Sequence, residues 1–213
     1  MAGLTQRSRA SATKVGDKEP SVIGTSERKM PSPSLSSRVG EDGRGGTEIA
    51  LKILLVGAPK VGKTSIVRRL TARPFKEEYI PTLGFDVVVI PYGSFQGREL
   101  YLHIWDVAGS QLCADPCHHG LLGAGAAGVM FVLDVSSRES LRAVDQWNDA
   151  LSLHLPPGVC KLLVGHKADL PAYVVGKEAL SLYVTGSSGF QDWCLTVGSP
   201  EFGDYDVAAR LGG

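Results

Sequence analysis

Short apolar runs alternate with stretches of helical periodicity along the chain from Ile49 onward. Residues 128–133 and 161–165 are apolar at nearly every position, which is typical of strands buried on both faces of a parallel sheet. Between these runs, apolar side chains recur at helical spacing, and residues 136–139 before them match a capping box. The helical apolar positions are Leu141, Val144, Trp147 and Leu151.

Two further predicted strands, at 85–90 and 100–105, lie on either side of a turn at 92–97. Because the connection is short, we expect these strands to pair antiparallel. The apolar run 51–56 adds another strand, and a helical pattern follows it at 65–70. Together the elements predict a three-layer α/β fold, with a mostly parallel sheet, one antiparallel edge strand, and helices on both faces.

The first 48 residues are a different kind of sequence. They are rich in Ser, Gly, Pro, Lys, Arg and Glu and show no apolar period, so they cannot bury enough surface to offset the entropy of ordering. We therefore expect a disordered arm at 1–48 and one folded domain at 49–213. A chain of 213 residues with 43% hydrophobic content is long enough for one domain with a complete core.

Composition argues against several classes of function. The 22 basic and 22 acidic residues balance, so no strong field favours nucleic acid, and the apolar runs are too short to span a bilayer. No N-terminal signal sequence is visible, and the four cysteines show no regular framework, which favours a reducing compartment. We expect a cytoplasmic monomer that does not bind nucleic acid.

Residues 57–64, GAPKVGKT, lie between the predicted strand 51–56 and the predicted helix 65–70 and match the phosphate-binding pattern GxxxxGK[ST]. Backbone N–H groups of such a loop point at the β-phosphate, Lys63 adds a cation for the β- and γ-phosphates, and the Thr64 hydroxyl is a ligand for Mg²⁺. The predicted fold is therefore that of a P-loop NTPase. The expected nucleotide-binding residues of this loop are Gly57, Pro59, Lys60, Val61, Gly62, Lys63, Thr64 and Ser65.

Three later motifs indicate which nucleotide is bound. Thr82 lies in a proline-containing loop from which its hydroxyl can reach the metal on the γ-phosphate side. Asp106 ends an apolar strand, where it can hold Mg²⁺ through water, and Gly109 can donate its N–H to the γ-phosphate. Asp169 follows another buried strand and can accept both N–H groups of the guanine edge, which adenine does not offer. We therefore predict GTP or GDP as the ligand, with Mg²⁺ held by Thr64, Thr82 and Asp106.

The order and spacing of these motifs resemble those of Ras-superfamily small GTPases over roughly residues 50–200. Residues 134–141, with Trp147 downstream, are most similar to the Rab branch. The resemblance implies a GTP/GDP cycle and a switch in vesicle or membrane traffic, or in signalling. It also implies effector proteins, an exchange factor and a GTPase-activating protein that contact the switch regions near Thr82 and Gly109. Three further residues are assigned to the base by the resemblance: His166, Lys167 and Gly198.

The chain departs from this family pattern at catalytic and base-binding positions. Ser110 stands where a glutamine usually orients the attacking water, and Gln111 follows one position later. A serine is too short to hold the water and reach the γ-phosphate, so we expect slow hydrolysis unless Gln111 swings in. His166 replaces the usual asparagine, and residues 197–199 replace the usual Ser-Ala-Lys, so we expect weaker nucleotide binding.

The ends of the sequence show no lipid-anchor motif. There is no C-terminal cysteine for prenylation, and the start Met1-Ala2-Gly3 does not fit the myristoylation pattern. Only about two turns of a final helix fit after Pro200, so the chain resembles a divergent, C-terminally short member of the family. We therefore expect membrane association only through a partner.

Three alternatives remain open. A pseudo-GTPase or scaffold would keep the fold but bind nucleotide weakly or never turn it over, and a P-loop kinase would use ATP to phosphorylate a small molecule. The cysteines and histidines at 113–119 offer zinc ligands, although their spacing matches no closed four-ligand site. The glycines at 120–128 weaken any helix, so we expect the segment after Asp106 to be loose.

Overall fold

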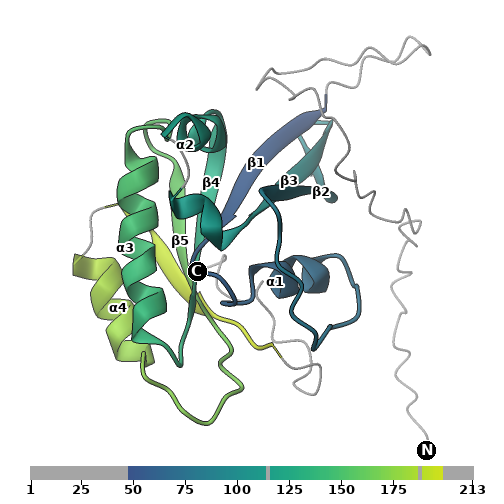
Figure 1. Ribbon diagram of the computed structural model, residues 1–213. Coiled ribbons are helices and arrows are strands. Elements are labelled where there is room, and N and C mark those ends of the chain that lie inside the picture. The colour runs from purple at the N-terminus through teal and green to yellow at the C-terminus, as the bar shows by residue number, and fades with distance from the viewer. Residues whose placement is uncertain (1–47, 114–115, 187–188, 199–213) are drawn as a thin grey trace, which may run out of the picture.

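A computed structural model describes residues 48–113, 116–186 and 189–198 of the chain (Figure 1). The predicted N-terminal arm up to residue 47 and the predicted final helix lie outside the described residues. None of the described helices is long and apolar enough to cross a bilayer. Every predicted nucleotide-binding, metal-binding or catalytic residue falls within the described ranges.

The described part of the chain forms one six-stranded sheet. Its strands are β1 (Ile49–Val56), β2 (Phe85–Phe95), β3 (Arg98–Val107), β4 (Ala126–Asp134), β5 (Cys160–His166) and β6 (Asp192–Leu195). Their spatial order is β2-β3-β1-β4-β5-β6 (Figure 1). Only β2 and β3 pair antiparallel, and the other neighbours are parallel. This confirms the predicted mostly parallel sheet with an antiparallel edge strand.

Helices cover both faces of this sheet, as predicted. They are α1 (Lys63–Leu70), α2 (Pro116–Gly123), α3 (Arg138–Ser152) and α4 (Lys177–Gly186), with a 3₁₀ helix, η1, at Gly109–Cys113. On one face, α2, α3 and α4 pack over a core that contains Phe131, Trp147 and Leu180. On the other face, Ile66 and Val67 of α1 pack against the sheet. Figure 1 shows α1 on the opposite side of the sheet from α3 and α4.

The apolar stripe predicted for α3 packs into the first of these cores. One of its members is partly buried and three are fully buried: Leu141, Val144, Trp147 and Leu151. The helix cap differs from the prediction by one residue, because Ser137 is the N-cap and its hydroxyl accepts the N–H of Ser140 at 3.3 Å. The third residue after the cap is therefore Ser140 and not Glu139, so the predicted capping box does not form.

The hairpin between β2 and β3 turns more tightly than predicted. Gln96 and Gly97 form a two-residue connection with φ angles of 52° and 76°, so β2 extends through most of the predicted turn at 92–97. Positive φ at both central positions is the geometry of a type I′ turn, which favours glycine. The tight turn fixes the register of the two strands and places Asp106 opposite Asp86.

The stretch after Asp106, which the sequence predicts to be loose, contains the helix α2. A Cβ on Gly123 would lie 2.7 Å from both the Cβ and the main-chain oxygen of His154, which follows α3. Glycine therefore lets α2 approach the end of α3 more closely than alanine could. This packing accounts for a helix in a segment whose glycines disfavour one.

Candidate functional site

The loop at 57–64 adopts a backbone geometry that its glycines permit. Gly57, Lys60 and Gly62 have φ angles of 148°, 64° and 99°. A Cβ on Gly57 would lie 2.1 Å from the main-chain oxygen of Val132, and one on Gly62 would lie 2.0 Å from Cδ2 of His166. Glycine is thus required at both positions by close packing as well as by φ. Loops of this kind, leading into a helix N-terminus, direct N–H groups into an anion-binding concavity.

Lys63 lies inside this loop, at the start of α1. Its Nζ donates hydrogen bonds to the main-chain oxygens of Gly57 at 3.0 Å and Ala58 at 2.8 Å. The side chain is 6% exposed, and burial lowers its pKa to about 8, while the charge of Asp106 raises it. The loop therefore holds a buried cation in place, ready for a charge-assisted hydrogen bond to an anion.

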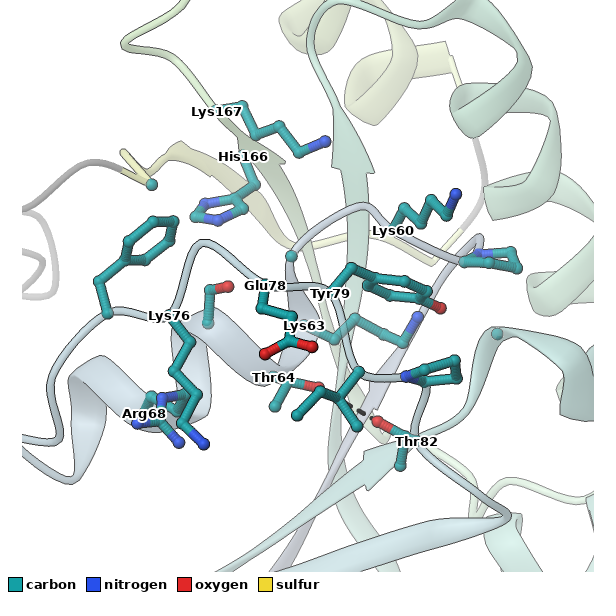
Figure 2. Close-up of a pocket in the computed structure, with 18 of the residues that line it drawn as sticks. Lys60, Lys63, Thr64, Arg68, Lys76, Glu78, Tyr79, Thr82, His166 and Lys167 are labelled. Atoms are coloured by element: carbon teal, nitrogen blue, oxygen red, sulfur yellow. Dashed lines mark hydrogen bonds between the residues drawn. The ribbon is translucent and has the colours of Figure 1, made fainter.

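Three side chains from separate segments meet beside the N-terminus of α1. The Thr64 hydroxyl donates to Oδ2 of Asp106 at 2.6 Å, and the same hydroxyl oxygen lies 3.2 Å from Oγ1 of Thr82. Figure 2 shows Thr64 and Thr82 facing each other, with Lys63 close by. The fold thus brings together all three residues for which the sequence predicts a role as Mg²⁺ ligands.

Asp106 is well suited to hold a cation. Its side chain is 2% exposed, and Oδ1 has no hydrogen-bond partner among the described residues. Burial raises the pKa of this carboxyl group, the Thr64 hydrogen bond and Lys63 lower it, and Asp86 raises it. A buried carboxylate oxygen without a partner is costly, and a hard cation with oxygen ligands, such as Mg²⁺, would satisfy it directly or through water. The residues present therefore fit the predicted metal.

A cavity of about 800 Å³ adjoins this cluster. It is lined by the phosphate-binding loop with α1, the segment 75–82, Asp86 of β2, residues 108–110, and the end of β5 with the residues after it, together with Gly198. Its volume is in the range of small-molecule sites. The lining includes many of the predicted site residues, namely Pro59, Lys60, Gly62, Lys63, Thr64, Ser65, Thr82, Gly109, Ser110, His166, Lys167, Asp169 and Gly198.

His166 ends β5 and is almost fully buried, with 3% of its surface exposed. Its Nδ1 lies 2.7 Å from Oγ1 of Thr196, and its ring packs against the backbone of Gly62. Burial lowers the pKa of the imidazole to about 4, so the ring is neutral at pH 7. His166 therefore joins the phosphate-binding loop to the segment after β6, in addition to lining the cavity.

Lys167 and Asp169 follow β5 in a loop that also contacts the end of β6. Lys167 has a φ of 63°, and its Nζ forms an ion pair with Asp134 at 2.6 Å. One carboxylate oxygen of Asp169 accepts the N–H of Gly198 at 2.8 Å. An ionised carboxylate can accept about four hydrogen bonds, so Asp169 can also accept N–H groups from a ligand.

Ser110 and Gln111 both belong to η1, but they are placed differently. Ser110 lines the cavity, whereas Gln111 is not part of its lining. The main-chain oxygen of Gln111 lies 3.1 Å from Nε2 of His119, whose ring packs edge-on against Trp147. His119 thus belongs to the packing between α2 and α3. Among the described residues, no group of three His, Cys, Asp or Glu side chains is placed to hold a metal ion.

Two of the remaining predicted residues, Gly57 and Val61, lie next to the cavity without forming its surface, and Gly109 both lines the cavity and contacts the loop. Val61 is 2% exposed and packs into the core between the sheet and α1. A Cβ on Gly109 would lie 2.4 Å from the main-chain nitrogen of Pro59, so the chain after Asp106 touches the phosphate-binding loop directly. Val61 and Gly57 therefore support the loop from behind, and Gly109 closes it on one side.

The sequence analysis missed most of the segment that covers the cavity. Between residues 75 and 82 it assigned a role only to Thr82, yet Phe75 and Tyr79 also line the cavity. These two aromatic residues are 41% and 50% exposed. The sequence feature that could have indicated this role is the presence of two aromatic residues in a short loop between Pro74 and Pro81.

The fold and the site define a class of protein, the P-loop α/β proteins. A buried lysine lies in the phosphate loop, a cluster of hydroxyl and carboxylate groups lies beside it, and Asp169 lines the same cavity. Sequence comparison gives the family within that class. The sequence model of the Ras family matches residues 52–187, which is more than half of the chain. The chain belongs to the Ras family.

Individual relatives agree with this placement. The chain is 35% identical over 131 residues to the Ras-related protein Rab-18 of Lymnaea stagnalis, covering 60% of this chain and 62% of that protein. It is 33% identical over 132 residues to the GTP-binding protein ypt1 of Schizosaccharomyces pombe, covering 60% and 64%. It is 37% identical over 122 residues to the Ras-related protein Rab-17 of Mus musculus, covering 56% and 54%. The predicted similarity to Rab proteins is confirmed, and the matches span less than two thirds of the length of these relatives.

Proposed function

We propose that this protein is a Rab-like small GTPase, a molecular switch that binds Mg²⁺ with GTP or GDP and acts through partners in membrane traffic or signalling. The observation that carries the proposal is the meeting of Thr64, Thr82 and Asp106 beside the buried Lys63. The folded domain that does this is assigned to residues 49–213.

The phosphate groups would be held by the loop at 57–64. Its N–H groups and Lys63 supply positive potential, and Lys63 needs only to exchange main-chain oxygens for phosphate oxygens. Thr64 and Thr82 supply oxygen ligands to Mg²⁺, and Asp106 holds it directly or through water. When bound, the metal ion neutralises charge that develops on the phosphates.

The base would lie toward the loop after β5. Asp169 offers acceptors that match the N–H donors of guanine, and Lys167 is held beside it through its ion pair with Asp134. Gly198 contributes its backbone, which already bonds to Asp169. His166 differs from the usual asparagine in function as well as in size, because its ring is used to pack against Gly62. We therefore propose guanine specificity with reduced affinity.

Hydrolysis is proposed to be slow. Ser110 lines the cavity but has a short side chain, while Gln111 is outside the lining. A water molecule would thus lack the long amide side chain that orients it in the family. A nucleotide-binding scaffold that never turns GTP over is the alternative, and a hydrolysis assay separates the two.

Partners are proposed to bind the segments that flank the phosphates. Ile80 and Leu83, on either side of Thr82, are 60% and 85% exposed, and exposed apolar side chains in a ligand-sensing loop suit an effector or a regulator. Gly109 begins the second such segment. We propose a cytoplasmic monomer that reaches membranes through a partner.

The first test is the identity of the bound nucleotide. The full-length protein is purified in Mg²⁺ and denatured, and the released nucleotide is identified by chromatography, beside Lys63→Ala and the remote surface control Lys177→Ala. Near-stoichiometric GDP or GTP in wild type and the control, but not in Lys63→Ala, is the expected result. A folded wild-type protein that carries no nucleotide and takes up no added GDP would contradict the proposal.

A further inference from the structure

Lys60 is an unusual residue at its position in the phosphate-binding loop. Its φ of 64° lies in the left-handed region, which glycine adopts readily and lysine does not. Such strained residues persist where the surrounding structure imposes them, and they concentrate at functional sites. The Lys60 side chain is exposed and lines the nucleotide cavity, so its charge is available there.

Two of the other lysines that line the cavity already have partners. Lys63 donates to two main-chain oxygens of the loop, and Lys167 is paired with Asp134. Among the described residues, Lys60 takes part in no hydrogen bond or ion pair, and its Nζ lies 5.2 Å from the centre of the Tyr79 ring. A cation–π contact between two exposed side chains is weak and easily exchanged for a stronger anion.

Tyr79 belongs to the segment that covers the cavity. At one end of the segment, the hydroxyl groups of Thr82 and Thr64 lie within hydrogen-bond distance. The contact between Tyr79 and Lys60 also connects the segment to the phosphate-binding loop. In the view of Figure 2 the Tyr79 side chain lies between those of Lys60 and Lys63. A ligand that enters the cavity along the loop would therefore meet Tyr79 and Lys60 together.

We propose that the Lys60 side chain is a second phosphate-binding cation, which rests on the Tyr79 ring and moves to the phosphate oxygens when a nucleoside phosphate binds. The inference deepens the proposed function and rests on it. The exchange replaces a weak contact by a charge-assisted one and removes the contact between Lys60 and Tyr79 of the segment 75–82. Lys60 thus links occupation of the phosphate site to the position of Tyr79.

The test measures binding of a fluorescent GDP derivative in Mg²⁺ at several salt concentrations. Lys60→Ala should weaken binding about tenfold, the low end for a hydrogen bond to a charged group, and its affinity should depend less steeply on salt. The matched control is Lys177→Ala, which removes an exposed lysine of α4 that does not line the cavity. Lys60→Gly, which suits positive φ, serves if the alanine variant does not fold.

The outcomes are separable. If wild type binds the GDP derivative and Lys60→Ala behaves like Lys177→Ala in affinity and salt dependence, the inference is wrong while the proposed function stands. If wild type binds no guanine nucleotide, both fail. A Tyr79→Leu background completes the test, because Lys60→Ala should cost at least as much there. A cost that disappears in this background would show that Lys60 acts through Tyr79, and it would overturn a direct phosphate contact.

Discussion

Lys63 and Asp106 counteract the effect of burial on each other. Burial lowers the pKa of Lys63 to about 8 and raises that of Asp106, while the charge of each partner acts in the opposite direction. Each charge therefore offsets part of the effect of burial on the other group, although burial has the larger effect on both pKa values. A cation at Oδ1 of Asp106 and a phosphate at Nζ of Lys63 would each stabilise the same charged state. Ligand binding and ionisation at this site are thus coupled.

His166 predicts an acid-sensitive fold. Its pKa is about 4 in the folded protein against 6.5 as the ordinary value, so the unfolded chain binds a proton more readily. The stability that this difference represents is complete above pH 6.5 and is lost as the pH falls toward 4. Urea unfolding of the full-length protein at pH 7 and pH 5 should therefore show a loss of about 2 kcal/mol from this residue.

The variant His166→Asn isolates that contribution, because asparagine does not titrate. Its free energy of unfolding should fall less than that of wild type between pH 7 and pH 5, whatever its stability at pH 7. His118→Asn, at an exposed position of α2, serves as the control and should follow wild type. Equal pH dependence in wild type and His166→Asn would show that the buried ring is not the source of acid sensitivity.

If Ser110 is the cause of slow GTP hydrolysis, a substitution at this position should increase the rate. Because Ser110 lines the cavity and Gln111 does not, Ser110→Gln should raise the single-turnover rate of GTP hydrolysis about tenfold to a hundredfold. Gln111→Ala should leave the rate unchanged. Both rates are measured on protein loaded with GTP, so that weak nucleotide binding does not enter. A large fall in Gln111→Ala would mean that Gln111 does reach the nucleotide.

At the scale of elements, α2 and α3 supply a prediction with an internal control. A Cβ on Gly123 would lie 2.7 Å from the main-chain oxygen and the Cβ of His154, whereas one on Gly120 would lie 3.6 Å from Nδ1 of the same residue. Gly123→Ala should destabilise the protein by about 1–3 kcal/mol through overpacking. Gly120→Ala should be neutral or stabilise by up to about 1 kcal/mol, because alanine favours the helix. Thermal unfolding of the two variants checks the opposite signs.

The elements also show where sequence reasoning succeeds. The spacing of Val144, Trp147 and Leu151 correctly predicted the buried face of α3, because apolar residues at a helical period can share only one face of a helix. The end of β2 and the cap of α3 were misplaced, because each depends on one or two backbone angles that neighbouring residues permit equally well. The sequence did not predict the helix α2, because this helix packs against His154, which lies about thirty residues later in the chain.

The candidate site divides in the same way. Thr64, Thr82 and Asp106 were predictable, because each lies in a motif with a fixed place relative to a strand or helix. The packing of His166 against Gly62 was not predictable, because it brings a side chain at the end of β5 against the backbone of a loop about a hundred residues earlier in the chain. The contact between Lys60 and Tyr79 was also missed, since nothing in either local sequence names the other residue as a partner.

At the scale of the whole molecule, the site lies where several separate parts of the fold meet. The phosphate loop contacts β4 through Gly57, the end of β5 through Gly62, and the start of η1 through Pro59. A ligand in the cavity would touch the loop, the segment 75–82 and the residues after β5 together. Binding should therefore stabilise the fold as a unit and not only the loop around the phosphates.

This argument predicts a thermal shift that depends on both nucleotide and metal. GDP at about 100 times its dissociation constant adds about 2.7 kcal/mol of stability, which for a domain of this size corresponds to a rise of about 5–10 °C in Tm. Chelating Mg²⁺ should reduce the rise in wild type, and Asp106→Asn should make it insensitive to Mg²⁺, because the buried carboxylate is then missing. ATP should raise Tm very little, since adenine does not present the pair of N–H donors that Asp169 can accept from guanine. An equal shift with ATP would contradict the role of Asp169, and a GDP shift unaffected by chelation would contradict the metal cluster of Thr64, Thr82 and Asp106.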